Sequence, residues 1–333
     1  MKAFVLTRYG NNQEIQAADM PEPLVNAEDV LIQVKAASVN PVDFKIRDGQ
    51  LKQVLPLRFP HILGNDVAGV VTRVGAKVTQ FKPGDEVYAR VDTDRMGAFA
   101  EYVAVKEAAV APKPASHTME EAASLPLVAL TAWQTLRDVG QLQPGQRVLI
   151  HAGSGGVGTV AIQLAKHWGA FVATTTSTAN VEWVQQLGAD RVIDYKKEAF
   201  ENVLEGYDLV LDTLGGEALD KSFQVLKAGG KVVSVAGPPD PQFAKDQGMN
   251  WLLQQVMGVL SFRVRRLAKK HQASYSFFLM HPSGAQLREL GALLDASIMR
   301  PVVDRTFPFE ATKEALDYLE TGRAKGKVVI TLS

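Results

Sequence analysis

The stretch His151–Thr159 (HAGSGGVGT) holds the residues of this chain whose spacing points most directly to chemistry. Gly153, Gly155 and Gly158 follow the pattern G-x-G-x-x-G, after the apolar run Val148–Ile150 and before a segment with helical apolar spacing. In such a turn the first glycine permits a tight bend, the second lets the backbone approach a pyrophosphate, and the third lets helix and strand pack closely. The helix N-terminus adds free N–H groups that attract an anion. We therefore predict a dinucleotide-binding site here.

The elements around this turn predict a nucleotide-binding domain of alternating strands and helices. Such alternation is typical of a parallel, doubly wound sheet. The predicted strands are Arg147–Ile150, Phe171–Thr175, Arg191–Asp194, Leu209–Asp212 and Lys231–Val235.

Residues 1–125 have a different rhythm, with short runs of strand formers separated by glycine and proline turns. They indicate a mostly antiparallel barrel or sandwich, with strands at Lys2–Thr7, Asp29–Ala37, Asp66–Val74, Glu86–Val91 and Ala98–Val105. The C-terminal segment alternates predicted helices and strands at Gly284–Ala296, Arg300–Asp304, Glu310–Thr321 and Lys327–Leu332. We expect its strands to complete the N-terminal sheet, so the predicted domains are 1–125 with 261–333, and 126–260 between them.

The composition excludes several classes of protein. The 333 residues have a formal net charge of zero, 22% charged residues and no cysteine. A balanced charge predicts neither a nucleic-acid partner nor a membrane partner, and the absence of cysteine removes thiolate nucleophiles and the commonest zinc ligands. No apolar run has the length of a signal peptide's core or a membrane span. These features predict a cytoplasmic protein.

The loop Thr174–Asn180 (TTTSTAN) lies where a dinucleotide site usually carries the acidic residue that binds the ribose diol. Here no carboxylate occurs before Glu182. Hydroxyl and amide groups can instead bind a 2′-phosphate, which a carboxylate would repel. The loop therefore favours NADP over NAD, although it contains no Lys or Arg and could also serve simply to cap a helix.

Four further segments each have a functional and a structural interpretation. Asn40–Arg47 could be an N-capped turn, or could direct Asn40 and Lys45 into a cleft; Gly64–Val71 could be a turn before a strand. The turn Asp212–Gly215 could lie beside a cofactor or merely end a strand. The basic run Arg263–His271 could be a solvated helix face or could help to bind cofactor phosphate. His61, His117, His151 and His167 have neither metal-ligand spacing nor a consistent nucleophile partner, so we interpret them as structural.

Several of these motifs together resemble the medium-chain dehydrogenase/reductase superfamily, and specifically its zinc-independent quinone oxidoreductase and alkenal/enone reductase branch. The resemblance rests on the N-terminal MKAFVLTRYG and on Asn40–Arg47, Gly64–Val71, Phe81–Val87, Ala122–Gln134, Val148–Lys166, Leu187–Tyr195 and Gly326–Leu332. It implies a GroES-like β-barrel catalytic domain together with a Rossmann NADP-binding domain. The zinc-containing relatives carry Cys where Asn40 stands and Gly-His-Glu where this chain has Gly64–Asp66, so the resemblance implies chemistry without a metal.

The resemblance also implies roles for individual residues. Asn40 and Lys45 would be catalytic, stabilising charge on a substrate oxygen. The cofactor would contact Thr131, Gly153, Gly155, Gly156, Val157, Gly158, Ser177, Asn180, Tyr195, Thr213, Gly237 and Lys327. Many relatives carry Lys or Arg where this chain has Asn180.

The predicted function is NADPH-dependent reduction of quinones or of the C=C bond of α,β-unsaturated carbonyls, and the resemblance implies a homodimer. Two alternatives remain: a non-catalytic NADPH-binding scaffold, and an enoyl-thioester reductase with a channel enlarged at 238–278.

Overall fold

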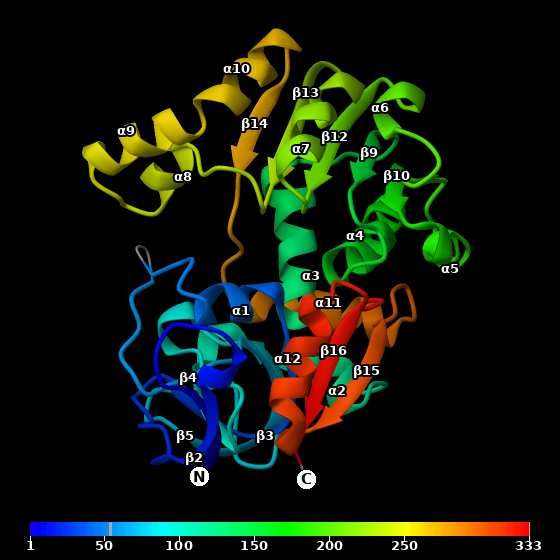
Figure 1. The fold of residues 1–333 in the computed structure, drawn as a ribbon. Coiled ribbons are helices and arrows are strands. Elements are labelled where there is room, and N and C mark those ends of the chain that lie inside the picture. Colours follow the sequence, from blue (N-terminus) through cyan, green and yellow to red (C-terminus); the bar gives the residue numbers. More distant parts are fainter. Residues whose placement is uncertain (53–54, 333) are drawn as a thin grey trace. The chain divides into compact units, whose positions relative to one another are not determined.

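The computed structural model describes residues 1–52 and 55–332, which divide into two compact units (Figure 1). Unit 1 combines Met1–Leu130 with the residues from His281 onward, and unit 2 is the unbroken segment Thr131–Met280. The sequence places the boundaries at 125 and 260 instead. The second boundary lies later because α10 (Phe262–Lys270) packs in the core of unit 2 and β14 (Ser274–Phe277) pairs within its sheet. The sequence analysis assigns both elements to the catalytic domain.

Unit 1 is built on two sheets whose strands are rich in Val, Ile and Ala. The larger sheet has the order β15-β16-β3-β5-β6-β8, with β7 also paired to β3, and the smaller has the order β2-β1-β4. These strands are β1 (Lys2–Leu6), β2 (Ile15–Asp19), β3 (Asp29–Val39), β4 (His61–Ile62), β5 (Asp66–Val74), β6 (Glu86–Arg90), β7 (Tyr102–Lys106), β8 (Val110–Pro112), β15 (Val303–Pro308) and β16 (Lys327–Thr331). The C-terminal strands thus complete the N-terminal sheet, as the sequence predicts.

Short helices connect these strands. Those of unit 1 are η1 (Asn12–Glu14), α1 (Pro41–Arg47), η2 (Thr93–Arg95), η3 (Glu107–Ala109), α2 (Met119–Ala123), α11 (Gly284–Asp295), η7 (Phe309–Ala311) and α12 (Thr312–Glu320). Helix α2 begins where the sequence indicates, because Oγ1 of Thr118 accepts a hydrogen bond from N of Glu121 at 3.2 Å, and Oε2 of Glu121 accepts one from N of Thr118 at 3.0 Å. Helix α3 (Pro126–Trp133) starts at a proline, as expected for a first helical position, and runs into unit 2.

The register of the large sheet of unit 1 decides which distant residues become neighbours. β3 pairs antiparallel with β5, which places Ser38 opposite Asp66. β3 also pairs antiparallel with β16, which places Val39 opposite Val328. The ends of three strands, and the polar residues just beyond them, are therefore brought together at one place.

Unit 2 has a six-stranded sheet in the order β11-β10-β9-β12-β13-β14, in which every adjacent pair is parallel. The strands are β9 (Arg147–Ile150), β10 (Phe171–Thr176), β11 (Arg191–Asp194), β12 (Tyr207–Asp212), β13 (Leu226–Ser234) and β14 (Ser274–Phe277). The strand order reverses between β9 and β12, and the crevice at such a point is where doubly wound sheets bind ligands. The predicted Rossmann arrangement is confirmed.

The helices of unit 2 surround this sheet. They are η4 (a π-helix, Gln134–Val139), α4 (Gly156–His167), η5 (Thr178–Asn180), α5 (Val181–Gln185), α6 (Phe200–Val203), α7 (Gly216–Ser222), η6 (Phe223–Val225), α8 (Pro241–Asp246), α9 (Trp251–Leu260) and α10 (Phe262–Lys270). Helix α10 buries Val264 and Ala268 in a core with Val210, Phe223 and Val232. No helix among the described residues is both long and apolar enough to cross a membrane.

Candidate functional site

The glycine turn of unit 2 connects β9 to α4 in close packing. The N–H of Gly153 donates to the carbonyl oxygen of Thr175 at 2.9 Å. A Cβ on Gly153 would lie 2.2 Å from Oγ1 of Thr174, and a Cβ on Gly158 would lie 2.3 Å from the carbonyl oxygen of Ala152. Only glycine fits at these two positions, because real Cβ atoms do not approach other atoms so closely.

The middle of the turn is less crowded, which is what a ligand-binding segment requires. A Cβ on Gly155 would meet only the carbonyl oxygen of Ala152, at 3.3 Å. Helical bonding starts with the N–H of Thr159, which donates to the carbonyl oxygen of Gly155 at 3.0 Å. The N–H groups of Gly156, Val157 and Gly158 therefore lie in the first turn of α4, where backbone donors are not used within the helix and can hold a phosphate.

The loop after β10 is organised by its own side chains. Nδ2 of Asn180 donates to Oγ of Ser177 at 3.1 Å, and Nε1 of Trp183 donates to Oδ1 of Asn180 at 3.0 Å. The N–H of Tyr195 donates to the carbonyl oxygen of Thr176 at 3.1 Å, so the end of β11 adjoins this loop. Ser177, Asn180 and Tyr195 are thus brought together at the carboxyl ends of two adjacent strands.

A cation that the sequence analysis overlooked lies beside this group. Lys196 follows Tyr195 directly, and its exposed side chain makes no hydrogen bond or ion pair within the described chain. The neighbouring Lys197, in contrast, lies 3.5 Å from the carboxylate of Asp194. The sequence does contain two lysines directly after LGADRVIDY. That these lysines lie near the loop after β10 becomes evident only once β10 and β11 are known to pair.

The ends of β12 and β13 are held by a buried carboxylate. Oδ1 of Asp212 accepts hydrogen bonds from the N–H groups of Leu214 and Gly215 at 3.0 Å each, and Oδ2 accepts one from Oγ of Ser234 at 2.6 Å. Ser234 in turn accepts a bond from the N–H of Gly237 at 2.8 Å. Asp212 thereby fixes both loops at this edge of the sheet.

Two cofactor candidates at this edge differ in their surroundings. Oγ1 of Thr213 lies 3.3 Å from the carbonyl oxygen of His151, so this residue adjoins the glycine turn. Gly237 is required by packing, because a Cβ there would lie 2.5 Å from the hydroxyl oxygen of Tyr275. A further cofactor candidate, Thr131, lies away from this edge, on α3. It is buried, and its carbonyl oxygen accepts a hydrogen bond from Oγ1 of Thr135 at 2.6 Å.

His151 is a buried connector of unit 2. Its Nδ1 lies 3.1 Å from Oγ1 of Thr175 and its Nε2 lies 2.9 Å from Oγ of Ser222. Burial lowers the pKa of His151 to about 4, so the neutral imidazole is the form present at neutral pH. These contacts fit the structural role that the sequence analysis assigns to it.

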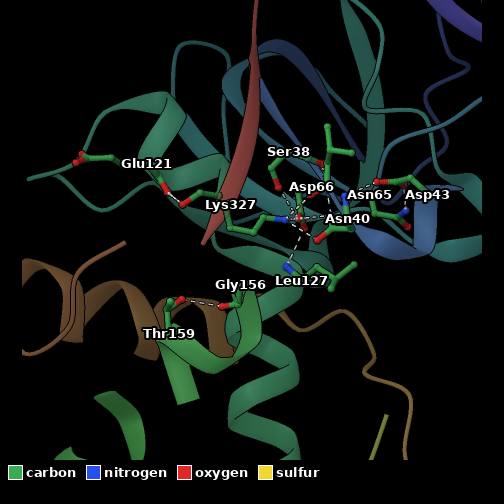
Figure 2. A network of polar contacts seen from close by, with 12 residues as sticks. Ser38, Asn40, Asp43, Asn65, Asp66, Glu121, Leu127, Gly156, Thr159 and Lys327 are labelled. Atoms are coloured by element: carbon green, nitrogen blue, oxygen red, sulfur yellow. Dashed lines mark hydrogen bonds and ion pairs between the residues drawn. The ribbon is translucent and has the colours of Figure 1, made fainter. Parts of the chain in front are cut away.

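Unit 1 contains a buried polar network around Asp66, shown in Figure 2. Its carboxylate accepts hydrogen bonds from Oγ of Ser38, from Nδ2 of Asn40 and from the N–H of Leu127, each at 2.8 Å. The ammonium of Lys327 lies 3.5 Å from Oδ2 of the same carboxylate. Both charged side chains are at least 94% buried, so each depends on these partners for solvation.

Asn40 is the centre of this network. Its Oδ1 accepts a hydrogen bond from Nζ of Lys327 at 2.5 Å, and its backbone N–H donates to Oδ2 of Asp43 at 2.7 Å. Helix α1 starts at the next residue, so the capped-turn interpretation describes the backbone correctly. The side-chain amide is fully buried and is hydrogen-bonded to Asp66 and Lys327.

Lys327 and Lys45 lie in different surroundings. The ammonium of Lys327, which the resemblance places at the cofactor, is held by Asn40, by Asp66 and by the carbonyl oxygen of Val39 at 2.9 Å. Its pKa is lowered by burial, against the opposing influence of the nearby carboxylates. Lys45 is exposed on α1, and the described part of the chain offers its side chain no partner in the network.

A second carboxyl group in the network carries a shifted pKa. Oδ1 of Asp43 accepts a hydrogen bond from Nδ2 of Asn65 at 2.7 Å. Burial raises the pKa of Asp43 to about 7, because the hydrogen bonds from Asn40 and Asn65 only partly offset the loss of water. Sequence reasoning singled out both segments involved but not their contact, which depends on tertiary structure.

Comparisons with known proteins identify the family. Residues 26–115 match the model of the alcohol dehydrogenase GroES-like domain, and residues 187–330 match a model described as zinc-binding dehydrogenase. The human NAD(P)H oxidoreductase RTN4IP1, mitochondrial, is 38% identical over 100% of this chain and 89% of the relative. An NADPH-dependent alkenal/one oxidoreductase, chloroplastic, of Arabidopsis thaliana is 38% identical over 99% of this chain and 79% of the relative. The quinone oxidoreductase of Coxiella burnetii has a TM-score of 0.88 at 32% identity, covering 100% of this chain and 99% of that one.

The chain therefore belongs to the medium-chain dehydrogenase/reductase superfamily, in its quinone oxidoreductase and alkenal/enone reductase branch. It is an oxidoreductase that uses a nicotinamide cofactor, as the glycine turn predicts.

The cytoplasmic location predicted from the sequence is contradicted by these relatives. The human and Arabidopsis relatives are named mitochondrial and chloroplastic, which points to an organelle instead. Absence of cysteine and of long apolar runs could not distinguish these compartments, because both features suit any reducing aqueous compartment.

Proposed function

We propose that this protein uses NADPH to reduce quinones or the C=C bond of α,β-unsaturated carbonyls. The observation that carries the proposal is the glycine turn at the strand-order reversal of unit 2, followed by a loop without carboxylates. Relatives named quinone oxidoreductase and alkenal/one oxidoreductase give the substrate class. When bound, NADPH supplies the hydride.

The residues of unit 2 fit this cofactor. The crowding at Gly153 and Gly158 holds the turn close to α4, while Gly155 leaves room for a ligand. The first-turn N–H groups of α4 would hold the pyrophosphate. Ser177, Asn180 and Tyr195 would bind the adenosine side of the cofactor.

Lys196 would supply the positive charge that the loop itself lacks. An exposed ammonium beside Tyr195 can approach a 2′-phosphate but gains nothing from a 2′-hydroxyl of NADH. We expect Lys196→Gln to weaken NADPH binding about 10-fold and to leave NADH binding nearly unchanged. Equal losses for both cofactors would contradict this role, and Lys82→Gln, an exposed lysine of unit 1, is the matched control.

We propose that Lys45 is the catalytic residue of unit 1, and that Asn40 and Lys327 are positioning residues. Asn40 fixes the start of α1 through Asp43, and Lys45 is the exposed cation on that helix. Its ammonium would stabilise negative charge as it develops on the substrate oxygen.

We propose that the reaction requires no zinc. The positions that carry ligands in zinc relatives hold Asn40, Asn65 and Asp66, and the carboxylate is paired with the ammonium of Lys327. Amide groups and an ammonium are a poor donor set for Zn²⁺. Within the described ranges, no three His, Cys, Asp or Glu residues are grouped to hold a metal. Activity should be unchanged in the presence of a metal chelator. The measured zinc content of the purified protein should be below one atom per chain.

We also propose that the protein is a homodimer formed along β14. This strand ends the six-stranded sheet, so backbone groups on its outer edge can pair with a second copy, except the N–H of Phe277, which donates to Oδ2 of Asp240 at 3.1 Å. Light scattering should give twice the chain mass of 36.2 kDa.

One assay tests the central proposal. Oxidation of NADPH and of NADH is followed with a panel of quinones, enals, enones and enoyl thioesters. We expect turnover with NADPH and with quinones, enals or enones. Binding of NADPH without turnover of any substrate would favour a non-catalytic scaffold instead.

A further inference from the structure

Helix α9 of unit 2 presents an uncovered apolar face. Only Met257 on this helix is buried. Leu252, Val256 and Val259 follow the spacing i, i+4, i+7 and are 56%, 44% and 77% exposed, and Leu260 beside them is 56% exposed. Large apolar side chains gathered on one helix face mark an interaction surface rather than ordinary surface variation.

Helix α10 follows after the single residue Ser261 and presents a basic face. Val264 and Ala268 fix its apolar side in the core of unit 2. The remaining surface is exposed and carries the positive charges of Arg263, Arg265, Arg266, Lys269 and Lys270. Figure 1 shows α8, α9 and α10 in yellow to gold at the β14 side of the unit.

A hollow beside α10 collects several of these charges. It has a volume of about 500 Å³ and lies between α7 and α10. Arg263 pairs there with Asp220, and Lys221 pairs with Glu201 and Glu217. Arg266 and Lys270 also line the hollow, and neither has an acidic partner in the described part of the chain. Their charges remain available to an anion from outside.

We propose that α9 and α10 form a docking surface for an anionic phospholipid membrane. The apolar face of α9 would enter the boundary between head groups and acyl chains, and the basic face of α10 would meet the phosphate groups. Helices that lie in a membrane interface carry an apolar and a basic face on one helix; here two consecutive helices would supply these two features. The proposal revises our expectation that the protein has no membrane partner. That expectation came from the zero net charge of the whole chain, which does not reveal a local cluster of positive charges.

A second copy of the chain fits the same surface less well. In a two-fold dimer that used both helices, each subunit would bring its own Arg266 and Lys270 to the interface, so the second copy would add positive charge without supplying a matching negative surface. An anionic membrane instead offers charge that complements Arg266 and Lys270. The proposal does not depend on the reductase activity, since it concerns residues outside the proposed cofactor and catalytic groups.

The test is co-sedimentation of the full chain with vesicles. One set consists of phosphatidylcholine alone, and the other contains about one third phosphatidylglycerol. We expect binding only to the second set, weakened by added salt, because salt screens attraction between exposed charges. Failure to bind either set, or equal binding to both, would overturn the proposal.

Two double variants assign the binding to these helices. Arg266→Gln with Lys270→Gln should weaken binding about 30-fold, whereas Arg191→Gln with Lys82→Gln removes the same charge elsewhere and should leave it unchanged. Equal losses in both pairs would show attraction by overall charge and would overturn the proposal.

The apolar face is tested with Leu252→Ser together with Val259→Ser. We expect vesicle binding to fall while the thermal unfolding midpoint and the mass in solution stay constant. A variant that changes the mass but keeps its vesicle binding would show that a second copy covers α9.

Discussion

Nζ of Lys327 lies 2.5 Å from Oδ1 of Asn40, although the two residues are 287 positions apart in the chain. The antiparallel pairing of β16 with β3 makes this contact, and the carboxylate of Asp66 joins it from β5. The side chain of Asn40, the residue that caps the start of α1, thus contacts a buried ion pair. This arrangement connects the stability of unit 1 to the position of Lys45.

The first prediction concerns removal of the buried ammonium. Lys327→Met should lower the free energy of unfolding by about 3–5 kcal/mol, because the carboxylate of Asp66 would stay buried without its charge partner. Urea denaturation measures the change. The double variant Lys327→Met with Asp66→Asn should recover part of the loss, since it removes both charges; no recovery would contradict the ion-pair explanation.

The second prediction concerns Asp43, whose pKa is raised from 3.8 to about 7 by burial. Between these values the folded protein keeps a proton that the unfolded chain has lost. The stabilisation from Asp43 is therefore complete below pH 4 and is lost as the pH rises to about 7, by at most about 1.4 kcal/mol per pH unit.

Asp43→Asn should remove this contribution, which denaturation at a series of pH values can measure. The amide can still accept the hydrogen bond from the N–H of Asn40. Oδ1 of Asn65, which is buried and has no hydrogen bond, can accept the new amide hydrogen after a flip of that side chain. An unchanged pH profile would mean that Asp43 is ionised in the folded protein.

The third prediction has the opposite sign and concerns His151 in unit 2. Its pKa is lowered to about 4 by burial, so the unfolded chain takes up a proton near pH 6.5 while the folded protein does not. The stabilisation from neutral His151 is complete above pH 6.5 and is lost as the pH falls towards 4. His151→Gln should flatten the acid limb, and a limb that stays equally steep would exclude this origin.

The fourth prediction separates the two kinds of glycine in the turn of unit 2. Gly158→Ala should cost about 1–3 kcal/mol of stability, because its Cβ would overlap the carbonyl oxygen of Ala152. Gly155→Ala should fold nearly normally but bind NADPH about 10-fold more weakly, since its methyl group occupies the approach to the pyrophosphate. Thermal denaturation and fluorescence titration measure the two effects, and the same stability loss in both variants would contradict the distinction.

The fifth prediction concerns Lys45. Lys45→Ala should lower kcat by about 10-fold or more with little change in NADPH affinity, because its charge acts on the substrate oxygen as negative charge develops there. Lys45→Arg should keep part of the activity. Lys82→Ala, at another exposed lysine of unit 1, is the control. An unchanged kcat in Lys45→Ala would exclude the residue from the reaction.

The sequence by itself determined the features that depend on local spacing. The glycine pattern, the strand–helix alternation and the absence of Cys and His where zinc relatives carry ligands all lie within short segments. Local backbone geometry follows from such segments, because a turn or a helix start depends on its own few residues. The family and the parallel sheet of unit 2 were therefore predictable, and so was the glycine turn.

Only the tertiary structure decided which distant residues meet and which surfaces stay uncovered. Strand register placed Lys327 on Asn40, a contact that the sequence did not predict, and Lys196 gained significance only when β11 was found beside β10. The strand β14 and the exposed face of α9 likewise escaped the sequence pattern. Register and burial are properties of the whole packed chain, because they depend on pairing between segments far apart in sequence.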